Sequence, residues 1–182
     1  VLFRSTIGLV NAVDHLALSA SVALEIDEIP TGGVAVVSQS GGILGSLLSR
    51  AAARGAGFSR LIATGNEADL EVNDLVEWLI DDPETGVIAL YLEGLRDSER
   101  FRELARRALT AGKPLVVYKV GRSEPGARSA TSHTGAMAGS DRAYDAFLEQ
   151  SGAIRVANFD DLIDVSSTLA SAPRDRKSTR LN

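Results

Sequence analysis

The sequence contains no cysteine, so disulfide bonds, thiol catalysis and thiolate metal sites are excluded. Aromatic residues make up only 5% of the 182 residues, and a stacking platform for nucleic-acid bases is therefore not expected. The net charge of −5 also argues against nucleic acid, because phosphate backbones are bound by basic surfaces. No run approaches the roughly 20 apolar residues that cross a bilayer, and no signal peptide is recognisable. These absences predict a cytoplasmic protein without nucleic-acid or membrane partners.

The composition that remains suits one domain with a proper core, since 45% of the residues are hydrophobic. Both ends look foreign. Residues 1–5 ("VLFRS") start without Met, and residues 173–182 form a basic tail that we interpret as disordered or non-native. Residues 1–30 do not show the alternation of apolar runs and helical segments found in the rest of the chain. We interpret them as a lead-in segment from a preceding domain. We therefore place the domain itself at 31–172.

Residues 31–172 alternate between short apolar runs and segments with helical spacing. The apolar runs are continuous rather than alternating, which is typical of parallel strands buried on both faces. Gly and Pro follow most helical segments, and Ser98 is a candidate N-cap for one of them. The predicted strands are 33–38, 58–64, 86–94, 113–121 and 153–157, and the predicted helices are 43–55, 72–82, 98–112, 140–152 and 159–171. This pattern predicts an α/β fold: a flavodoxin-like, doubly wound parallel sheet of five strands in the order 2-1-3-4-5.

In such a sheet, ligands bind outside the carboxyl ends of the strands. The turn "SQSGG" (38–42) follows the first predicted strand and opens a helix. Gly41 and Gly42 allow the backbone to approach a ligand, and Ser40 can cap the helix, whose free N–H groups attract anions. The spacing is neither GxGxxG nor that of a Walker loop, and a plain strand-to-helix turn would have the same residues.

Other polar residues gather at the same edge. Glu93 ends the third predicted strand, where a carboxylate can orient an imidazole by accepting its N–H, although exposed acids are also common there. Asn66 and Asp69 in "GNEAD" follow the second strand, but both types belong in turns anyway. Lys119, Arg122 and Arg128 add positive charge.

His133 is the most specific signal, because it lies among small residues in a connection (122–139) far longer than the roughly two to six residues usual in such folds. No second histidine stands at metal-ligand spacing, so no metal site is predicted. The order Ser40, acid, His133 would also suit a serine hydrolase, with "SQSGG" in place of GxSxG. In the third interpretation, the imidazole of His133 accepts a phosphoryl group, is oriented by Glu93 and faces a phosphate-binding helix start.

Five ordered segments resemble the acyl-CoA synthetases that form a nucleoside diphosphate, which are the ADP-forming acetate–CoA ligases and their succinyl-CoA synthetase relatives. The segments are "VAVVSQSGG", "TGNEAD", "DDPETGVIALYLEG", "KPLVVYKVGRSEPGARSATSHTGAMAGSD" and "GAIRV". Together the resemblance covers residues 6 to 172, and "TIGLVN" (6–11) is similar to the exit from that family's CoA-binding domain.

The resemblance implies that acyl-CoA, phosphate and ADP interconvert with acid, CoA and ATP through an acyl phosphate and a phosphohistidine. It implies that His133 is phosphorylated and that Glu93 contacts it. The implied phosphate-binding residues are Ser38, Gln39, Ser40, Gly41 and Gly42, and Gly65 and Asn66 are weaker candidates for the substrate pocket.

The same resemblance implies CoA, ATP or ADP and Mg in the complete enzyme, with none bound tightly here. No CoA-binding or ATP-grasp domain is recognisable, so an ATP-grasp domain or beta subunit is the expected partner and an oligomer is expected. Three other functions remain open: an acyl-CoA-sensing region of a protein lysine acetyltransferase, the serine hydrolase on Ser40, and a flavodoxin-like module that binds another anion.

Overall fold

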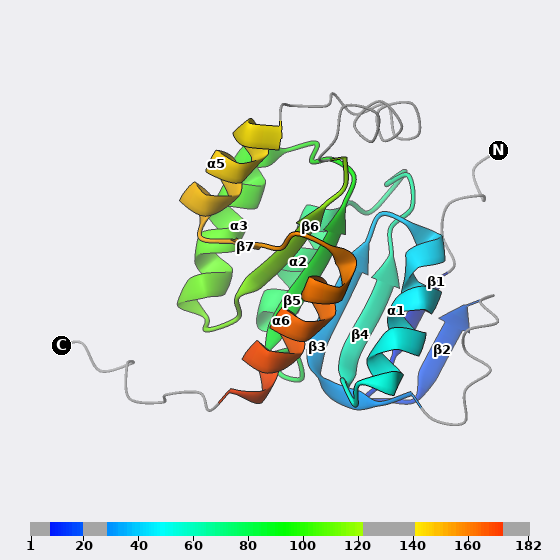
Figure 1. Cartoon of the computed structure of the whole chain (residues 1–182). Helices are drawn as coiled ribbons and strands as arrows, with labels where there is room; N and C mark the ends of the chain where they lie inside the picture. The colour runs from blue at the N-terminus through cyan, green and yellow to red at the C-terminus, as the bar shows by residue number, and fades with distance from the viewer. Residues whose placement is uncertain (1–7, 20–28, 122–140, 173–182) are drawn as a thin grey trace.

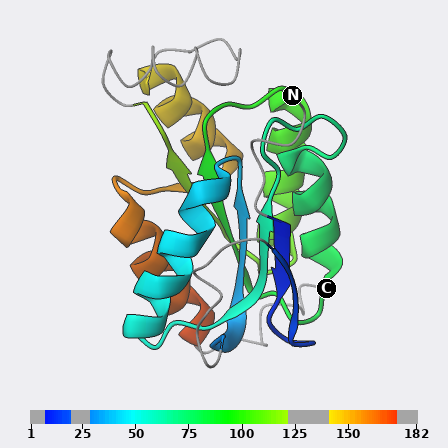
Figure 2. The same ribbon diagram turned by 90° about the vertical axis from the view of Figure 1, so that its right-hand side faces the viewer.

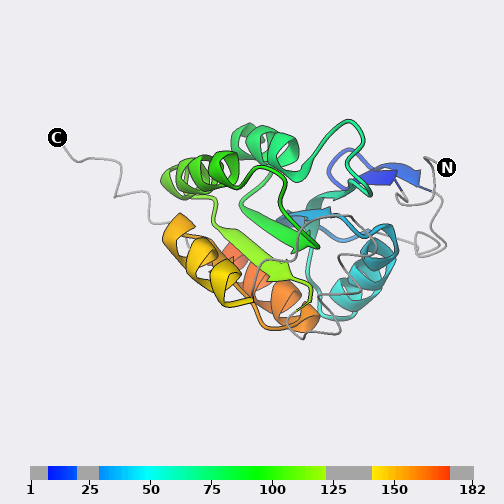
Figure 3. The same ribbon diagram turned by 90° about the horizontal axis from the view of Figure 1, so that it is seen from above.

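The computed structural model describes residues 8–19, 29–121 and 141–172 of the chain. They form a sheet with helices on both sides (Figures 1 and 3). The strands are β1 (Gly8–Asn11), β2 (Leu16–Ser19), β3 (Thr31–Ser38), β4 (Phe58–Ala63), β5 (Val87–Leu92), β6 (Leu115–Lys119) and β7 (Ile154–Arg155). The helices are α1 (Gly41–Ala53), α2 (Val72–Asp81), α3 (Ser98–Thr110), α5 (Asp141–Ser151) and α6 (Phe159–Ser171).

The sheet of the described residues has seven strands in the order β2-β1-β4-β3-β5-β6-β7. A sheet of five strands in the order 2-1-3-4-5 is therefore not what is found. The five strands from β3 onward are parallel and lie next to one another as β4-β3-β5-β6-β7. The α/β class is confirmed, and the sheet is mostly parallel because, in the described part of the chain, antiparallel pairing is limited to β1–β2 and β1–β4.

The two additional strands come from the segment interpreted as a lead-in. β1 and β2 form a hairpin that adds to the sheet edge, where Val10 of β1 lies opposite Leu61 of β4. Val10 is buried, whereas Leu16 and Leu18 of β2 are exposed. Each strand has only four residues, and β2 contributes nothing to the core, so the apolar pattern did not reveal either of them. The domain boundary at residue 31 stays a prediction.

Side chains of the parallel strands alternate between two cores. On one face, Val34 and Val36 of β3 pack with the apolar side of α1 and with α6. On the other face, Ala35 and Val37 pack with α2, α3 and α5. Figure 2 shows these helical layers on opposite sides of the sheet. Because both faces are covered, the central strands are apolar throughout, as the continuous runs predicted.

Most predicted helix ends agree with the structure to within two residues, but one cap differs. Asp97, not Ser98, is the N-cap of α3, and its carboxylate accepts a hydrogen bond from Arg100 N at 3.0 Å. None of the helices in the described ranges is long and apolar enough to cross a membrane.

Candidate functional site at the carboxyl edge of the sheet

The turn between β3 and α1 is fixed by Ser38. Its hydroxyl is fully buried, donates to the carbonyl oxygen of Ser40 at 2.8 Å and accepts the N–H of Ser40 at 3.1 Å. The carbonyl of Ser38 accepts the N–H of Thr64 from the loop after β4. Ser38 therefore shapes the turn rather than offering its hydroxyl to a ligand.

The start of α1 is the part of this turn that can receive an anion. Ser40 is the N-cap, but its hydroxyl makes no cap hydrogen bond, and the first turn holds no acidic side chain. The first N–H groups of a helix have no partners inside it and carry partial positive charge. At Gly42 a Cβ would meet nothing within 4 Å, so the helix start is open there. Phosphate oxygens fit this donor set.

Gln39, for which the resemblance predicts a phosphate contact, makes several hydrogen bonds within the protein. Its N–H donates to the carbonyl of Tyr91, and its side-chain N–H groups donate to Glu67 Oε1 at 2.9 Å and to the carbonyl of Gly94 at 2.8 Å. Its Oε1 accepts the backbone N–H groups of Glu93 and Gly94. The N–H groups of Gln39 are thus bonded to Tyr91 and Gly94 at the end of β5 and to Glu67 in the loop after β4.

Glu93 follows β5 at the crevice between β3 and β5. This is the point where the strand order reverses, with α1 on one face and α2 on the other, and ligands of open α/β sheets bind there. The backbone of Glu93 is held by Gln39, but no described residue donates a hydrogen bond or an ion pair to its carboxylate. The carboxylate is half-buried and is free to accept an N–H from a further group.

Two titratable groups lie near Glu93. Burial, the neighbouring Tyr118 and the charge of Glu93 raise the pKa of Tyr91 to about 12. Burial and Arg155 lower the pKa of Lys119, whereas Asp141 and Glu93 act to raise it. Lys119 is 7% exposed, donates to the carbonyl of Val120 at 2.6 Å and lies 4.8 Å above the ring of Tyr144. The surroundings of Glu93 are thus partly apolar, which strengthens electrostatic interactions there.

The loop after β4 contributes its backbone and one buried acid. Gly65 has φ +60°, which glycine adopts without strain, and is buried. Asn66 is exposed, and its carbonyl oxygen accepts a hydrogen bond from Arg96 at 2.7 Å. Glu67 is buried and bonded to Gln39. The loop is therefore tied to the ends of both β3 and β5.

Thus the structure brings eight of the nine predicted site residues to one edge: Ser38, Gln39, Ser40, Gly41, Gly42, Gly65, Asn66 and Glu93. The ninth, His133, lies outside the described residues. Within the described ranges, no three His, Asp or Glu side chains come together as metal ligands.

Sequence reasoning passed over the burial of Glu67 and Lys119. In the sequence, Glu67 resembles a solvated charge in a loop, and Lys119 resembles a solvated charge at the end of a strand. The sequence features that could have indicated their burial are weak. Glu67 stands between two residues of a turn motif, and Lys119 ends an apolar strand. Their burial depends on partners far away in the chain.

Ser40 lacks the conformation of a hydrolase nucleophile. Its φ of −99° and ψ of 115° are ordinary extended values, whereas the serine of a nucleophile elbow lies on a sharp, strained turn. This observation speaks against the hydrolase reading.

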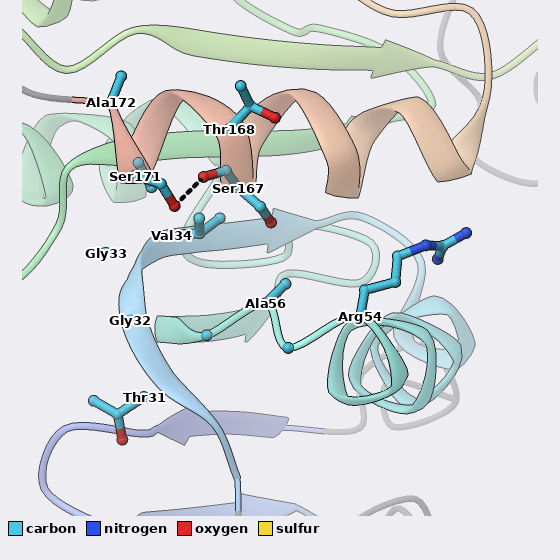
Figure 4. A pocket seen from close by; sticks show the side chains of 13 residues that line it. Thr31, Gly32, Gly33, Val34, Arg54, Ala56, Ser167, Thr168, Ser171 and Ala172 are labelled. Atoms are coloured by element: carbon cyan, nitrogen blue, oxygen red, sulfur yellow. Dashed lines mark hydrogen bonds between the residues drawn. The ribbon is translucent and has the colours of Figure 1, made fainter.

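A cavity of about 760 Å³ lies at the opposite, amino edge of the sheet. Figure 4 shows it between the start of β3, at Thr31 and Gly32, and the end of α6, at Ser167 and Ser171. Arg54 lines it as well, but its guanidinium is paired with Asp160 and Asp164. The cavity and the candidate site residues therefore lie at opposite edges of the sheet.

The sequence profile of the succinyl-CoA ligase-like flavodoxin domain matches residues 31–169. The chain belongs to this family. Among curated relatives, the chain is 38% identical over 167 residues to the ADP-forming acetate–CoA ligase of Methanocaldococcus jannaschii, covering 92% of this chain and 23% of the relative. It is 39% identical over 168 residues to the ADP-forming 4-hydroxybutyrate–CoA ligase of Nitrosopumilus maritimus, covering 92% and 24%.

Solved structures agree with the family assignment. The chain has a TM-score of 0.82 and 35% identity with the dinucleotide-forming acetyl-coenzyme A synthetase 1 of Ca. Korarchaeum cryptofilum in complex with phosphate and ADP, covering 92% of this chain and 36% of that one. An ATP citrate lyase of Methanosaeta concilii shares the fold, with a TM-score of 0.71 at 23% identity, over 91% of this chain and 29% of that one. The chain thus spans about a quarter to a third of the length of these relatives.

Proposed function

We propose that this chain is the part of an ADP-forming acyl-CoA synthetase in which acyl-CoA, phosphate and a phosphorylated histidine meet. The complete reaction interconverts acid, CoA and ATP with acyl-CoA, ADP and phosphate. Family membership and the names of the relatives support this reaction class. Those names include acetate, 4-hydroxybutyrate and trans-ferulate, so the proposal specifies the reaction and not the acid.

The proposed sequence has three transfers. A phosphate oxygen attacks the thioester carbonyl of acyl-CoA, the C–S bond breaks, and CoA thiolate leaves with an acyl phosphate remaining. A ring nitrogen of His133 attacks the phosphorus, the P–O bond to the acyl group breaks, and the acid leaves as carboxylate. An oxygen of the ADP β-phosphate then takes the phosphoryl group, which gives ATP and restores the imidazole.

Two features at the carboxyl edge support these steps. The open start of α1 would hold phosphate oxygens and stabilise the charge that develops on them. The Glu93 carboxylate would accept the N–H of the imidazole, so that the other ring nitrogen is the nucleophile. The observation that carries the proposal is Glu93: its backbone is fixed at the β3–β5 crevice, and its carboxylate has no partner among the described residues.

Other parts of the reaction require residues that this domain does not supply. We propose that a CoA-binding domain and an ATP-grasp domain or beta subunit provide the CoA site, the ATP or ADP site and Mg. The name of a Pyrococcus furiosus relative, subunit alpha of an ADP-forming acetate–CoA ligase, supports a divided enzyme of this kind. We also propose that the assembly is an oligomer that works in the cytoplasm.

Phosphopeptide mass spectrometry of the complete ligase tests the proposal. The protein, with its nucleotide-binding part, is exposed to Mg·ATP and kept alkaline, because phosphohistidine is labile in acid. We expect phosphate on His133 that disappears when CoA and acid are added, and no phosphate in the His133→Ala control. Unphosphorylated His133 in a protein shown to bind ATP would contradict the proposal and favour the acyl-CoA-sensing alternative.

Labelling with a fluorophosphonate probe separates the hydrolase alternative. We expect no adduct on Ser40, because its backbone has ordinary extended dihedral angles. An adduct at Ser40 that is lost in Ser40→Ala would contradict this expectation.

A further inference from the structure

The side chain of Gln39 has its full set of hydrogen bonds. Its two N–H groups donate to Glu67 Oε1 at 2.9 Å and to the carbonyl of Gly94 at 2.8 Å. Its oxygen accepts the N–H groups of Glu93 and Gly94, the latter at 3.0 Å. Gln39 itself is only 9% exposed, so water does not readily replace these partners. The amide group of Gln39 thus fixes the backbone at Glu93 through the N–H groups of Glu93 and Gly94.

These bonds exist in only one orientation of the amide. A rotation of 180° would turn the NH₂ group toward the N–H groups of Glu93 and Gly94, and the oxygen toward two acceptors. The orientation is therefore set from both sides of the amide, by the two N–H donors at its oxygen and by the two acceptors at its NH₂ group. One of these acceptors is the carbonyl of Gly94, and the only side chain among the described residues that accepts there is that of Glu67, through Oε1.

Glu67 is held in place at some cost. It has φ +54°, a left-handed conformation that is uncommon for a residue other than glycine, and it is 7% exposed. Glu67 Oε1 also accepts the N–H of Val72, the first residue of α2, at 3.1 Å. Glu67 Oε2 lies 3.5 Å from Nε of Arg96, which belongs to the loop after β5. A buried acid in a strained conformation persists where its surroundings require it, and such residues cluster at functional sites.

We propose that Glu67 and Gln39 are positioning residues: Glu67 orients the Gln39 amide, and the amide fixes the backbone of Glu93 so that its carboxylate faces the reaction. The inference rests on the proposed function, because it needs a role for Glu93. It adds residues that act through Glu93 and do not touch the substrate. Arg96 supports Glu67 from the exposed side, since its guanidinium also donates to the carbonyl of Asn66 at 2.7 Å.

A double-mutant cycle in the complete ligase tests this chain of contacts. Glu67→Ala and Gln39→Ala are made alone and combined with Glu93→Ala, and the rate of phosphohistidine formation is measured with Mg·ATP. We expect each single variant to slow this step by roughly 10-fold to 10²-fold, since a misplacement of about 1 Å can cost that much. In the Glu93→Ala background, neither should cause further loss, because the carboxylate that they position is gone.

The conservative variant Glu67→Gln adds a readout that a purely structural role would not produce. Its amide oxygen can still accept from Gln39 and Val72, so we expect it to recover most of the rate that Glu67→Ala loses. Hydrogen exchange measured on the same proteins gives a second readout if Gln39→Ala folds poorly. We expect the amides of Glu93 and Gly94 to exchange faster in Glu67→Ala than in Glu67→Gln.

Thr85→Val is the matched control, because it also removes buried hydrogen bonds but lies at the amino edge. It should lower the melting temperature and leave the phosphorylation rate unchanged. The inference is overturned if Glu67→Ala and Gln39→Ala behave like Thr85→Val, or if their losses multiply with that of Glu93→Ala. A full rate in Glu93→Ala itself would instead overturn the role of Glu93 in the proposed function, and so the two failures are distinguishable.

Discussion

The two edges of the sheet both carry buried polar groups but use them differently. At the amino edge, Thr85 is fully buried, and its hydroxyl bonds to Asp82 at 2.7 Å and to Ser59 at 2.9 Å. The Asp82 carboxylate also pairs with Arg60 at 3.3 Å. At the carboxyl edge, the Gln39 amide is as well satisfied, but it holds Glu93, whose carboxylate has no partner among the described residues.

This difference separates stability from function. The amino-edge side chains bond mainly to one another, so their removal should cost folding free energy and little else. The carboxyl edge leaves an acid and a helix start open, and these are the groups that can act on a substrate. The cavity of about 760 Å³ lies at the amino edge, at the other end of the sheet from the proposed site.

Removing the core that both edges share should have the largest effect. Phe101 is fully buried and packs against Phe147 with ring centroids 5.8 Å apart. We expect Phe101→Ala to lower the free energy of unfolding by about 3–5 kcal/mol, because it removes a large side chain and leaves a cavity. Denaturant unfolding measures this. A loss below about 1 kcal/mol would contradict the packing described for this face.

The proposed role of the carboxyl edge in the reaction depends on Glu93. We expect Glu93→Ala to lower kcat of the complete ligase by roughly 10²-fold to 10³-fold, the range typical of an acid–base partner. The melting temperature should change little, because the carboxylate bonds to no described residue. Steady-state kinetics and thermal unfolding on the same preparation measure both quantities. A destabilised variant with normal kcat would place Glu93 with the structural residues.

The contribution of the amino edge to stability depends on Thr85. Replacing its hydroxyl in Thr85→Val leaves Asp82 and Ser59 each without one buried partner. We expect the free energy of unfolding to fall by about 1–3 kcal/mol, because unsatisfied buried groups are costly. Thr85→Ser, which keeps the hydroxyl, is the control and should lose less. If kcat falls as much as in Glu93→Ala, the two edges are not separate in function.

The smallest expected effect is a pH dependence at Glu67. Burial raises the pKa of this carboxyl, against the hydrogen bonds from Gln39 and Val72 and the charge of Arg96. A raised pKa in the folded state means stability that is present below the unfolded pKa near 4.5 and is lost as the pH rises through the folded value. We therefore expect the wild type to lose stability relative to Glu67→Gln as the pH rises from below 4.5 through the raised pKa of the folded state. A pH-independent difference in urea unfolding would contradict this.

Much of the fold could be predicted because its signals are local. The runs that became β3, β5 and β6 are apolar along their length, and Gly or Pro marks most helix ends. The β1–β2 hairpin could not be predicted in the same way, since its strands are short and β2 is exposed. β1 owes its place to pairing with β4, and β2 owes its place to pairing with β1, which no local pattern encodes.

The position of the candidate residues in the fold could be predicted, but their contacts with one another could not. Strand ends converge at one edge, so topology alone gathers Ser38, Gln39 and Glu93 there. The role of Gln39 depends on bonds to Glu67 and Gly94, which lie 28 and 55 residues further along the chain. Neither these contacts nor the burial of Glu67 has a signature in the sequence around them.

The most direct test of the account is the rate of phosphohistidine formation in the complete ligase, measured in parallel for the wild type, Glu93→Ala and Thr85→Val. The account predicts a loss of about 10²-fold or more in Glu93→Ala, and a rate close to that of the wild type in Thr85→Val below its melting temperature. Equal rates in all three proteins, or equal losses in both variants, would contradict the claim that the carboxyl edge holds the chemistry and the amino edge the stability.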